Sequence, residues 1–370
     1  MPEVALAHIR TRTVWYVHGF DPATTARYRR IFTAAAERFD VEITDLDDDT
    51  EGWVATRDGV RTEFRYVRYQ DLVWGFGDRT HAQRLTRGLG AFWSYVRSGS
   101  LRRIAKRTPR GAALIASPWL FLFGLPLSVL VPAASIGPWA LGLIAGAAVV
   151  CNGLFSRFYL DLLADLFAYQ RVLAAGVSED WTAYRRRMEK LAGDIEPGTA
   201  DEVLIVGHSL GGIGAILIAD QVAARQPGAA LSLMTLGSTH GIVLSQTGAG
   251  RDHLAAAIHR VATAPGVNWL DVSSPRDAFC VPLTDPLLLA GPPPDAARSP
   301  RVISAPLRNA PPIPGDRRTV FAAMRRHMGY LMAPQQSGAF DYADWITGTE
   351  PLGARIARRG NSPKARMWHG

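Results

Sequence analysis

Residues 202–224, EVLIVGHSLGGIGAILIADQVAA, decide the fold. The run up to residue 206 is mostly aliphatic and predicts a buried strand, whereas the small and aliphatic residues after residue 212 predict a helix. The intervening GHSLGG, residues 207–212, contains the pattern G-x-S-x-G. The stretch therefore predicts a strand, a sharp turn with a serine at its tip, and a helix.

The chemistry of this turn suits a nucleophilic serine. Gly207 and Gly211 flank Ser209, because a sharp strand-to-helix turn leaves no room for side chains beside the nucleophile. The N-terminus of the following helix offers backbone N–H groups to a developing oxyanion. A bare G-x-S-x-G is a weak signal, and the alternative is an ordinary glycine-rich turn. The strand before it, His208 and the additional Gly212 favour the catalytic interpretation.

The rest of the chain alternates strand-like runs with helical patterns, which favours an α/β fold with a largely parallel sheet. The expected strands are 13–17, 63–69, 202–206, 231–236, 268–272 and 301–304. The expected helices are 22–39, 79–107, 158–192, 212–225, 251–263 and 317–332. A proline-rich surface excursion is expected at 291–315. The acidic run at 45–52 is expected to be a solvated loop, because its spacing does not match a calcium loop.

The composition of the 370 residues is that of a folded protein, with 48% hydrophobic and 20% charged residues. It excludes disorder across the whole chain, and the length allows one large domain or two ordinary ones. Two cysteines, Cys151 and Cys280, exclude a disulfide framework and a cysteine-rich metal site. Residues 1–13 lack the apolar core of a secretory signal.

One long segment departs from this average. Residues 111–156 contain no Asp, Glu, Lys or Arg in 46 positions. A bilayer core of about 30 Å needs roughly 20 helical residues, so we predict two membrane spans at about 112–132 and 136–156. The predicted body is then 1–110 with 157–370, interrupted by a transmembrane helical hairpin. The alternatives are a buried hairpin of a soluble domain and a re-entrant element.

The net charge of +8 is localised. Residues 97–110 contribute +6 and residues 351–370 contribute +5, both without an acidic residue. A basic cluster beside an apolar hairpin fits the positive-inside rule and anionic lipid headgroups better than nucleic acid, for which no binding motif is present. We expect an integral membrane protein whose main domain faces the cytoplasm, with the bilayer as partner and no nucleic acid.

A second motif, VWYVHGF at residues 14–20, reads as an early strand ending in His18-Gly19. With the GHSLGG turn, it makes the chain similar to an α/β-hydrolase, in particular a lipase or esterase, over about 13–80 and 200–335. The resemblance implies a mostly parallel sheet flanked by helices and a site that needs no metal or organic cofactor. It also implies an oxyanion hole, for which the backbone N–H groups of Phe20 and Leu210 are the candidates. The inserted hairpin departs from the soluble members.

The resemblance further implies a triad in the chain order Ser, then Asp or Glu, then His. Asp277 is the favoured acid because it lies just past an expected strand, whereas Asp271 lies within that strand and Asp285 lies further on. His327 is the only histidine after this acid except His369 near the chain end.

Five other histidines or acids remain to be considered beside the triad candidates. His240 follows the expected strand 231–236 and either lines the pocket or is structural. His253 and His259 precede the acid, and Asp21 or His18 could be structural neighbours of the oxyanion hole.

These roles predict hydrolysis of a carboxylic ester through an acyl-enzyme, with His327 as base, Asp277 as its orienting acid and Ser209 as nucleophile. A lipid or another long-acyl ester is the expected substrate, because the hairpin would hold the catalytic mouth near the bilayer. One alternative is an esterase or thioesterase on a soluble substrate, with the hairpin only as anchor. The other is a non-catalytic membrane scaffold with a hydrolase fold. The oligomeric state is not predicted.

Overall fold

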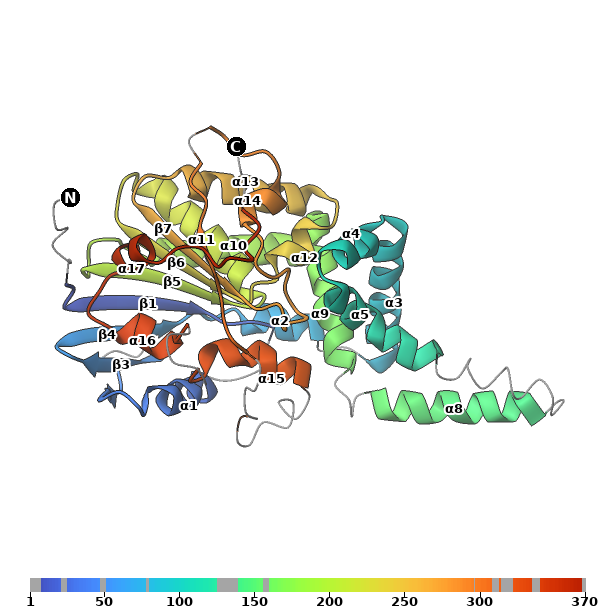
Figure 1. The fold of residues 1–370 in the computed structure, drawn as a ribbon. Helices are drawn as coiled ribbons and strands as arrows, with labels where there is room; N and C mark the ends of the chain where they lie inside the picture. The colour runs from blue at the N-terminus through green and yellow to red at the C-terminus, as the bar shows by residue number, and fades with distance from the viewer. Residues whose placement is uncertain are drawn as a thin grey trace.

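A computed structural model describes residues 8–20, 25–46, 51–77, 80–124, 139–155, 160–295, 297–307, 313, 322–334 and 340–367. Its centre is one eight-stranded sheet in the order β2-β3-β4-β1-β5-β6-β7-β8 (Figure 1). The strands are β1 Thr11–Val17, β2 Glu42–Thr44, β3 Gly52–Arg57, β4 Val60–Tyr66, β5 Glu202–His208, β6 Leu231–Leu236, β7 Val267–Ser273 and β8 Arg301–Ser304. From β4 across to β8 all neighbours are parallel, and β3 is antiparallel to β2 and β4. The predicted α/β class with a mostly parallel sheet is confirmed.

The helices lie on both faces of the sheet. They are α1 Thr25–Ala36, α2 Gln70–Gly77, α3 His81–Arg97, α4 Ser100–Arg107, α5 Pro109–Trp119, α8 Trp139–Phe155, α9 Leu160–Ala175, α10 Glu179–Gly193, α11 Gly211–Arg225, α12 His240–Leu244, α13 Ala249–Thr263, α14 Pro286–Ala290, α15 Ala322–Met328, α16 Tyr342–Thr347 and α17 Leu352–Arg358. Every residue of β5 and β6 is buried, because helices cover both faces of these central strands. One core joins the sheet to α9, α10, α11 and α13, and a second joins it to α1 and α16.

All six predicted strands are present, with ends that differ by at most three residues. The predicted helices at 79–107 and 158–192 are each two helices. The first breaks at Gly99 and the second at Gly176, whose φ values of 68° and 71° are left-handed and end a right-handed helix. The antiparallel strands β2 and β3 and the helices α16 and α17 were not predicted.

The uncharged segment 111–156 differs from the prediction in its first part. Residues 112–119 lie in α5, which packs on α9 with Ile115 and Trp119 buried, so they belong to the body and do not form a lipid-facing span. The 17-residue α8 projects away from the body (Figure 1). Within the described ranges, no helix combines the length and the apolar character needed to cross a bilayer. The predicted turn lies in 125–138, outside those ranges.

A buried ion pair links the sheet to the C-terminal helices. Arg12 on β1 donates from Nε to Oε2 of Glu202 on β5 at 2.6 Å, and both side chains are almost fully buried. The remaining guanidinium nitrogens donate to the carbonyl oxygens of Ile346, Gly348 and Glu350. Burial lowers the pKa of Arg12, and the Glu202 carboxylate opposes that effect. Each nitrogen of the Arg12 guanidinium therefore donates a hydrogen bond within the protein.

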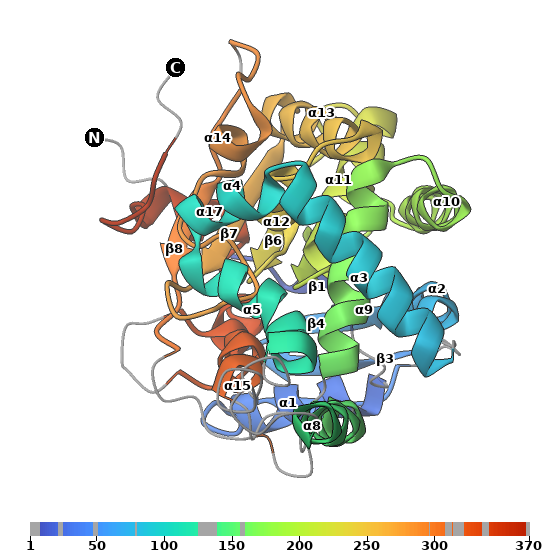
Figure 2. The same cartoon turned by 90° about the vertical axis from the view of Figure 1, so that its right-hand side faces the viewer.

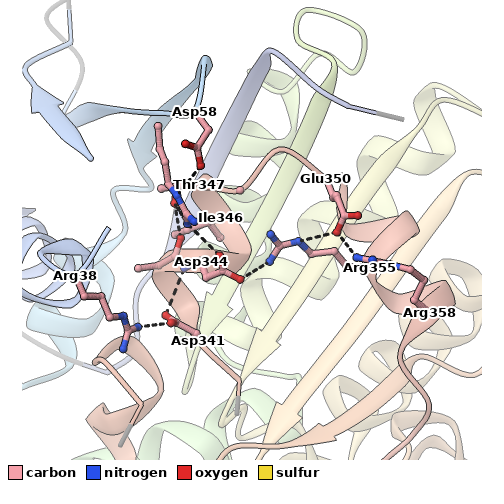
Figure 3. Close-up of polar contacts among 12 residues, drawn as sticks. Arg38, Asp58, Asp341, Asp344, Ile346, Thr347, Glu350, Arg355 and Arg358 are labelled. Atoms are coloured by element: carbon pink, nitrogen blue, oxygen red, sulfur yellow. Dashed lines mark hydrogen bonds and ion pairs between the residues drawn. The ribbon is translucent and has the colours of Figure 1, made fainter. Parts of the chain in front are cut away.

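The C-terminal helices are also held by a surface network of charges (Figure 3). Arg355 on α17 lies between the carboxylates of Asp344 and Glu350, at 3.0 and 3.8 Å. Arg38 at the end of α1 pairs with Asp341, which caps the N-terminus of α16. These contacts link α16 to α17 and to the residues that follow α1.

We predict that Arg12→Leu destabilises the fold by about 3–5 kcal/mol, because it leaves Glu202 buried without a counter-charge. Arg185→Leu is the matched control, since Arg185 pairs with Glu189 on the exposed side of α10. It should cost under about 0.5 kcal/mol. Urea unfolding measures both, and equal effects of the two substitutions would contradict a structural role for the buried pair.

Candidate active site

The backbone at Ser209 has the strained geometry of a sharp turn. Its φ is 59°, a left-handed value that non-glycine residues seldom adopt. The turn is held on both sides, because the Ser209 N–H donates to the Leu236 carbonyl at 3.0 Å and the Ser209 carbonyl accepts from Thr239 N–H at 3.1 Å. The strain is thus imposed by the neighbouring strand β6, as expected of a functional position.

The glycines around Ser209 are required by close packing. A Cβ at Gly211 would lie 2.0 Å from the Val17 carbonyl oxygen, and one at Gly207 would lie 2.6 Å from the Cβ of Ala215. A Cβ at Gly212 would lie 2.2 Å from Ser238 Oγ, and one at Gly19 would lie 2.8 Å from the Cβ of Ser209 itself. No L side chain fits at these positions without displacement of the backbone. The GHSLGG pattern therefore lets β1, β5 and α11 converge on the serine.

Asp277 and His327 meet at the same edge of the sheet. His327 Nδ1 and Asp277 Oδ2 are 2.9 Å apart, and both side chains are buried. Asp277 follows β7, and His327 lies at the end of α15. The two residues are 50 positions apart, and the hydrogen bond through Nδ1 leaves the other ring nitrogen, Nε2, available. Among the described residues this Nε2 has no hydrogen-bond partner.

Asp277 is stabilised as a carboxylate. Its Oδ1 accepts from Phe279 N–H at 2.9 Å, and its Oδ2 also accepts from the Tyr330 hydroxyl at 3.0 Å. Burial raises the pKa of Asp277, but the attraction of His327 and these hydrogen bonds outweigh it, so the pKa lies below its ordinary value. An ionised carboxylate is what orients a histidine and stabilises its protonated form.

Ser209 and His327 line one small cavity of about 30 Å³, room for one or two water molecules. No hydrogen bond links these two side chains in the described structure, as often holds for catalytic pairs without substrate. The rest of the lining is mainly apolar: Gly19, Phe20, Tyr28, Leu162, Leu163, Leu166, His208, Phe279, Met324 and Met328. The chemistry of the lining matches an acyl group, and side chains of α9 or α15 must move to admit one.

The proposed oxyanion donors flank the serine. Leu210 follows Ser209 at the start of α11, and Phe20 lines the cavity. Among the described residues, neither of their N–H groups donates a hydrogen bond, so both are free for a ligand. The loop between β1 and Phe20 is held by Tyr69, whose hydroxyl donates to the carbonyl oxygens of His18 and Gly19.

Two of the predicted histidines have structural contacts beside the site. His18 is buried and stacks between Tyr66 and Tyr69, with ring centroids 5.1 and 4.3 Å away. His208 contacts the carbonyl oxygen of His327 from Nε2 at 3.0 Å, so it supports the main chain at His327. Both are positioning neighbours, which is the role left open for His18.

His240 is not among the residues that line the Ser209 cavity. Its Nδ1 contacts Ser238 Oγ at 2.8 Å, and burial lowers its pKa to about 4. His253 lies edge-on to Trp181, and His259 reaches the Gly291 carbonyl, so the structure does not bring these two to the site.

The alternative acids have other partners. Asp271 accepts from Thr235 Oγ1 within the sheet, where burial raises its pKa to about 7. Asp285 caps the N-terminus of α14. Asp21 and His369 lie outside the described residues.

Tyr330 and the apolar side chains of α9 and α15 were not predicted from the sequence. Tyr330 lies three residues after His327 and shares Oδ2 of Asp277 with it. Its place in the short sequence HMGY was the available signal. The α9 leucines are separated from the serine by more than 40 positions and carry no motif.

Comparison of the chain with models of known families, with curated proteins and with solved structures finds no match.

We predict that Tyr330→Phe lowers kcat/KM about fivefold, because it removes one hydrogen bond of about 1 kcal/mol from the carboxylate while Phe279 N–H and His327 remain. With less competition for Oδ2, the Asp277–His327 pair should hold its proton more tightly, so the acid limb of the pH–rate profile should move to higher pH. A Tyr342→Phe variant, in another buried tyrosine remote from Asp277, is the control. An unmoved pH profile in Tyr330→Phe would show that Tyr330 only fills space.

Proposed function

We propose that this protein is a serine hydrolase that cleaves carboxylic esters with apolar acyl groups. The observation that carries the proposal is the buried hydrogen bond between Asp277 and His327, because His327 lines the same cavity as the strained Ser209. The chain order of the three residues and the strand–turn–helix context of the serine agree with the α/β-hydrolase resemblance.

In the proposed mechanism, His327 Nε2 accepts the proton of the Ser209 hydroxyl while Oγ attacks the ester carbonyl. Asp277 holds the ring through Nδ1 and stabilises the imidazolium. The N–H groups of Phe20 and Leu210 are placed to stabilise the negative oxygen. His327 returns the proton to the leaving alcohol, and water then attacks the acyl-enzyme by the same route and releases the acid.

The apolar lining supports a lipid or long-acyl substrate. Leucines of α9 and methionines of α15 surround the serine, and the carboxyl ends of the parallel strands point toward α9 (Figure 1). The exposed apolar helix α8 projects on the same side of the molecule, with Val149 exposed to 73%. We include in the proposal that α8 contacts a membrane and that the body lies on its cytoplasmic side, as the basic cluster at 97–110 suggests.

An esterase or thioesterase for a soluble substrate is the second candidate, favoured by the small size of the cavity, which fits a short acyl group without rearrangement. A non-catalytic scaffold is the least consistent candidate, because it would have no use for an ionised buried carboxylate aimed at a histidine beside a strained serine.

Covalent labelling tests the proposed chemistry. We predict that a fluorophosphonate probe labels the full-length protein and that Ser209→Ala abolishes the label, because the probe reacts with activated serines. Ser245→Ala is the control, since Ser245 is also buried but hydrogen-bonds Arg107 and the Gly241 carbonyl. Absence of labelling in folded protein, or equal loss in both variants, would refute a serine hydrolase.

Acyl-chain preference separates the two substrate classes. We predict at least about tenfold higher kcat/KM for octanoyl than for acetyl esters, since each buried CH₂ contributes about 0.8 kcal/mol. Leu166→Ala should shift the preference toward longer chains because it enlarges the cavity. Leu173→Ala removes a leucine of the same helix that does not line the cavity, so it should lower stability without changing preference. Equal rates on both esters would favour a soluble, short-acyl substrate.

A further inference from the structure

The outer side of α3 exposes an apolar stripe. Leu89, Trp93 and Val96 lie at helical spacing, so they share one side of the helix, and Trp93 is 62% exposed. The opposite side of α3 is the one that packs, where Tyr95 is fully buried and Gly88 contacts the Trp119 ring. One side of α3 therefore packs on the protein, and its outer side still exposes apolar side chains. Such a surface on a soluble protein marks a partner.

The basic residues of α4 divide between the body and the outside. Arg103 and Arg107 point inward, where they hydrogen-bond the carbonyl and hydroxyl of Ser245 at the end of α12. Arg102 and Lys106, one turn apart, are exposed and have no ion pair with a described residue. Half of the charge on this helix therefore fixes it to the fold, and the other half faces solvent without a counter-ion from the protein.

The segment that carries this surface has only positive charges, although Arg84 and Arg87 of α3 pair with Asp161 on α9 and Asp180 on α10. No Asp or Glu occurs between residues 79 and 160, whereas ten Lys and Arg do. The pKa of Arg107 is lowered by burial and by the nearby Arg366, Arg103 and Arg251. Positive groups thus accumulate here beyond those of α4 itself.

The two surfaces and α8 share one face of the molecule. Figure 2 looks onto that face, with α3, α4 and α5 in front of the sheet and α8 directed toward the viewer. The π-helical turn Leu120–Gly124, which follows α5, exposes Leu120 and Phe123 and contacts α8. A plane laid on α3 and α4 would therefore be penetrated by α8.

From this placement we infer that the α3–α4 face is a docking surface for an anionic lipid bilayer, with Leu89, Trp93 and Val96 in the interfacial layer and Arg102 and Lys106 at the headgroups. A bilayer interface accommodates an exposed Trp and aliphatic side chains beside cationic ones. Nucleic acid would engage the charges but leave the aliphatic stripe in water. An acidic protein partner would not account for the uncharged α8 that emerges from the same face.

The inference rests on the proposed function, in which the substrate is a lipid. Docking by this face would place the carboxyl ends of the strands, and so Ser209, toward the membrane. It is tested without catalysis. All binding measurements use full-length Ser209→Ala protein, so a failure of hydrolysis and a failure of docking are seen separately.

The first experiment is co-flotation with vesicles of phosphatidylcholine, alone or with 30 mol% phosphatidylglycerol. Binding should be tighter to the anionic vesicles, and Arg102→Glu with Lys106→Glu should weaken it at least about 25-fold, since each basic residue lost near an anionic surface costs about fivefold. Arg186→Glu with Lys190→Glu is the matched control, because these residues are also exposed and one turn apart, on α10. Equal binding to both vesicle types, or equal effects of the two pairs, would overturn the inference.

The second experiment reports where the bound protein touches the membrane. A polarity-sensitive fluorophore on Trp93→Cys, in a Cys151→Ser background that leaves only the buried Cys280, should shift to the blue on anionic vesicles. The same label on Arg186→Cys should not shift. A label at position 93 that stays in water while the protein is vesicle-bound would show that α8 alone makes the contact, and would also overturn the inference.

Discussion

The left-handed backbone of Ser209 is the constraint on which the rest of the site depends. A non-glycine residue in this conformation costs of order 1–3 kcal/mol and persists only where its surroundings impose it. Here β6 supplies the carbonyl that binds the Ser209 N–H, and β1 supplies the carbonyl oxygens that approach Gly211. The register of three neighbouring strands therefore fixes one side chain. A change in the register of any of these strands would remove the contacts that hold the Ser209 turn.

A glycine also permits close packing around Asp277. Gly237 at the end of β6 has a φ of 50°, and a Cβ there would lie 2.4 Å from the Tyr330 ring and 3.0 Å from Asp277 Oδ2. The missing side chain is what allows Tyr330 and His327 to reach one carboxylate oxygen together. Burial by itself would favour the neutral form of Asp277, and the convergent donors outweigh this effect, so the pKa of Asp277 is lowered.

The central strands and the site were predictable because their signals are local. Glu202–His208 and Leu231–Leu236 are largely apolar runs. The glycines around Ser209 indicate by themselves that the backbone is closely packed there. The chain order implied by the resemblance selected His327, and the position just past the strand selected Asp277, which His327 contacts. β2 was not predicted because it is an edge strand of three residues, and β3 was not predicted because it begins directly after the acidic run. Tyr330 was not predicted because its contact with Asp277 arises only when two distant segments meet. The bounds of the first predicted span were wrong because lack of charge does not distinguish a packed helix such as α5 from a lipid-facing one.

The position of β1 in the sheet has a consequence for how the chain is made. Its two neighbours are β4, about 50 positions later, and β5, with which Arg12 pairs across 190 positions. During synthesis the uncharged segment leaves the ribosome well before β5 does, so it meets its surroundings while one edge of β1 is still unpaired. Such long-range pairing is slow and exposes strand edges. The Ser209 turn, which needs β1 and β5 side by side, therefore forms only after the helices between them have been synthesised.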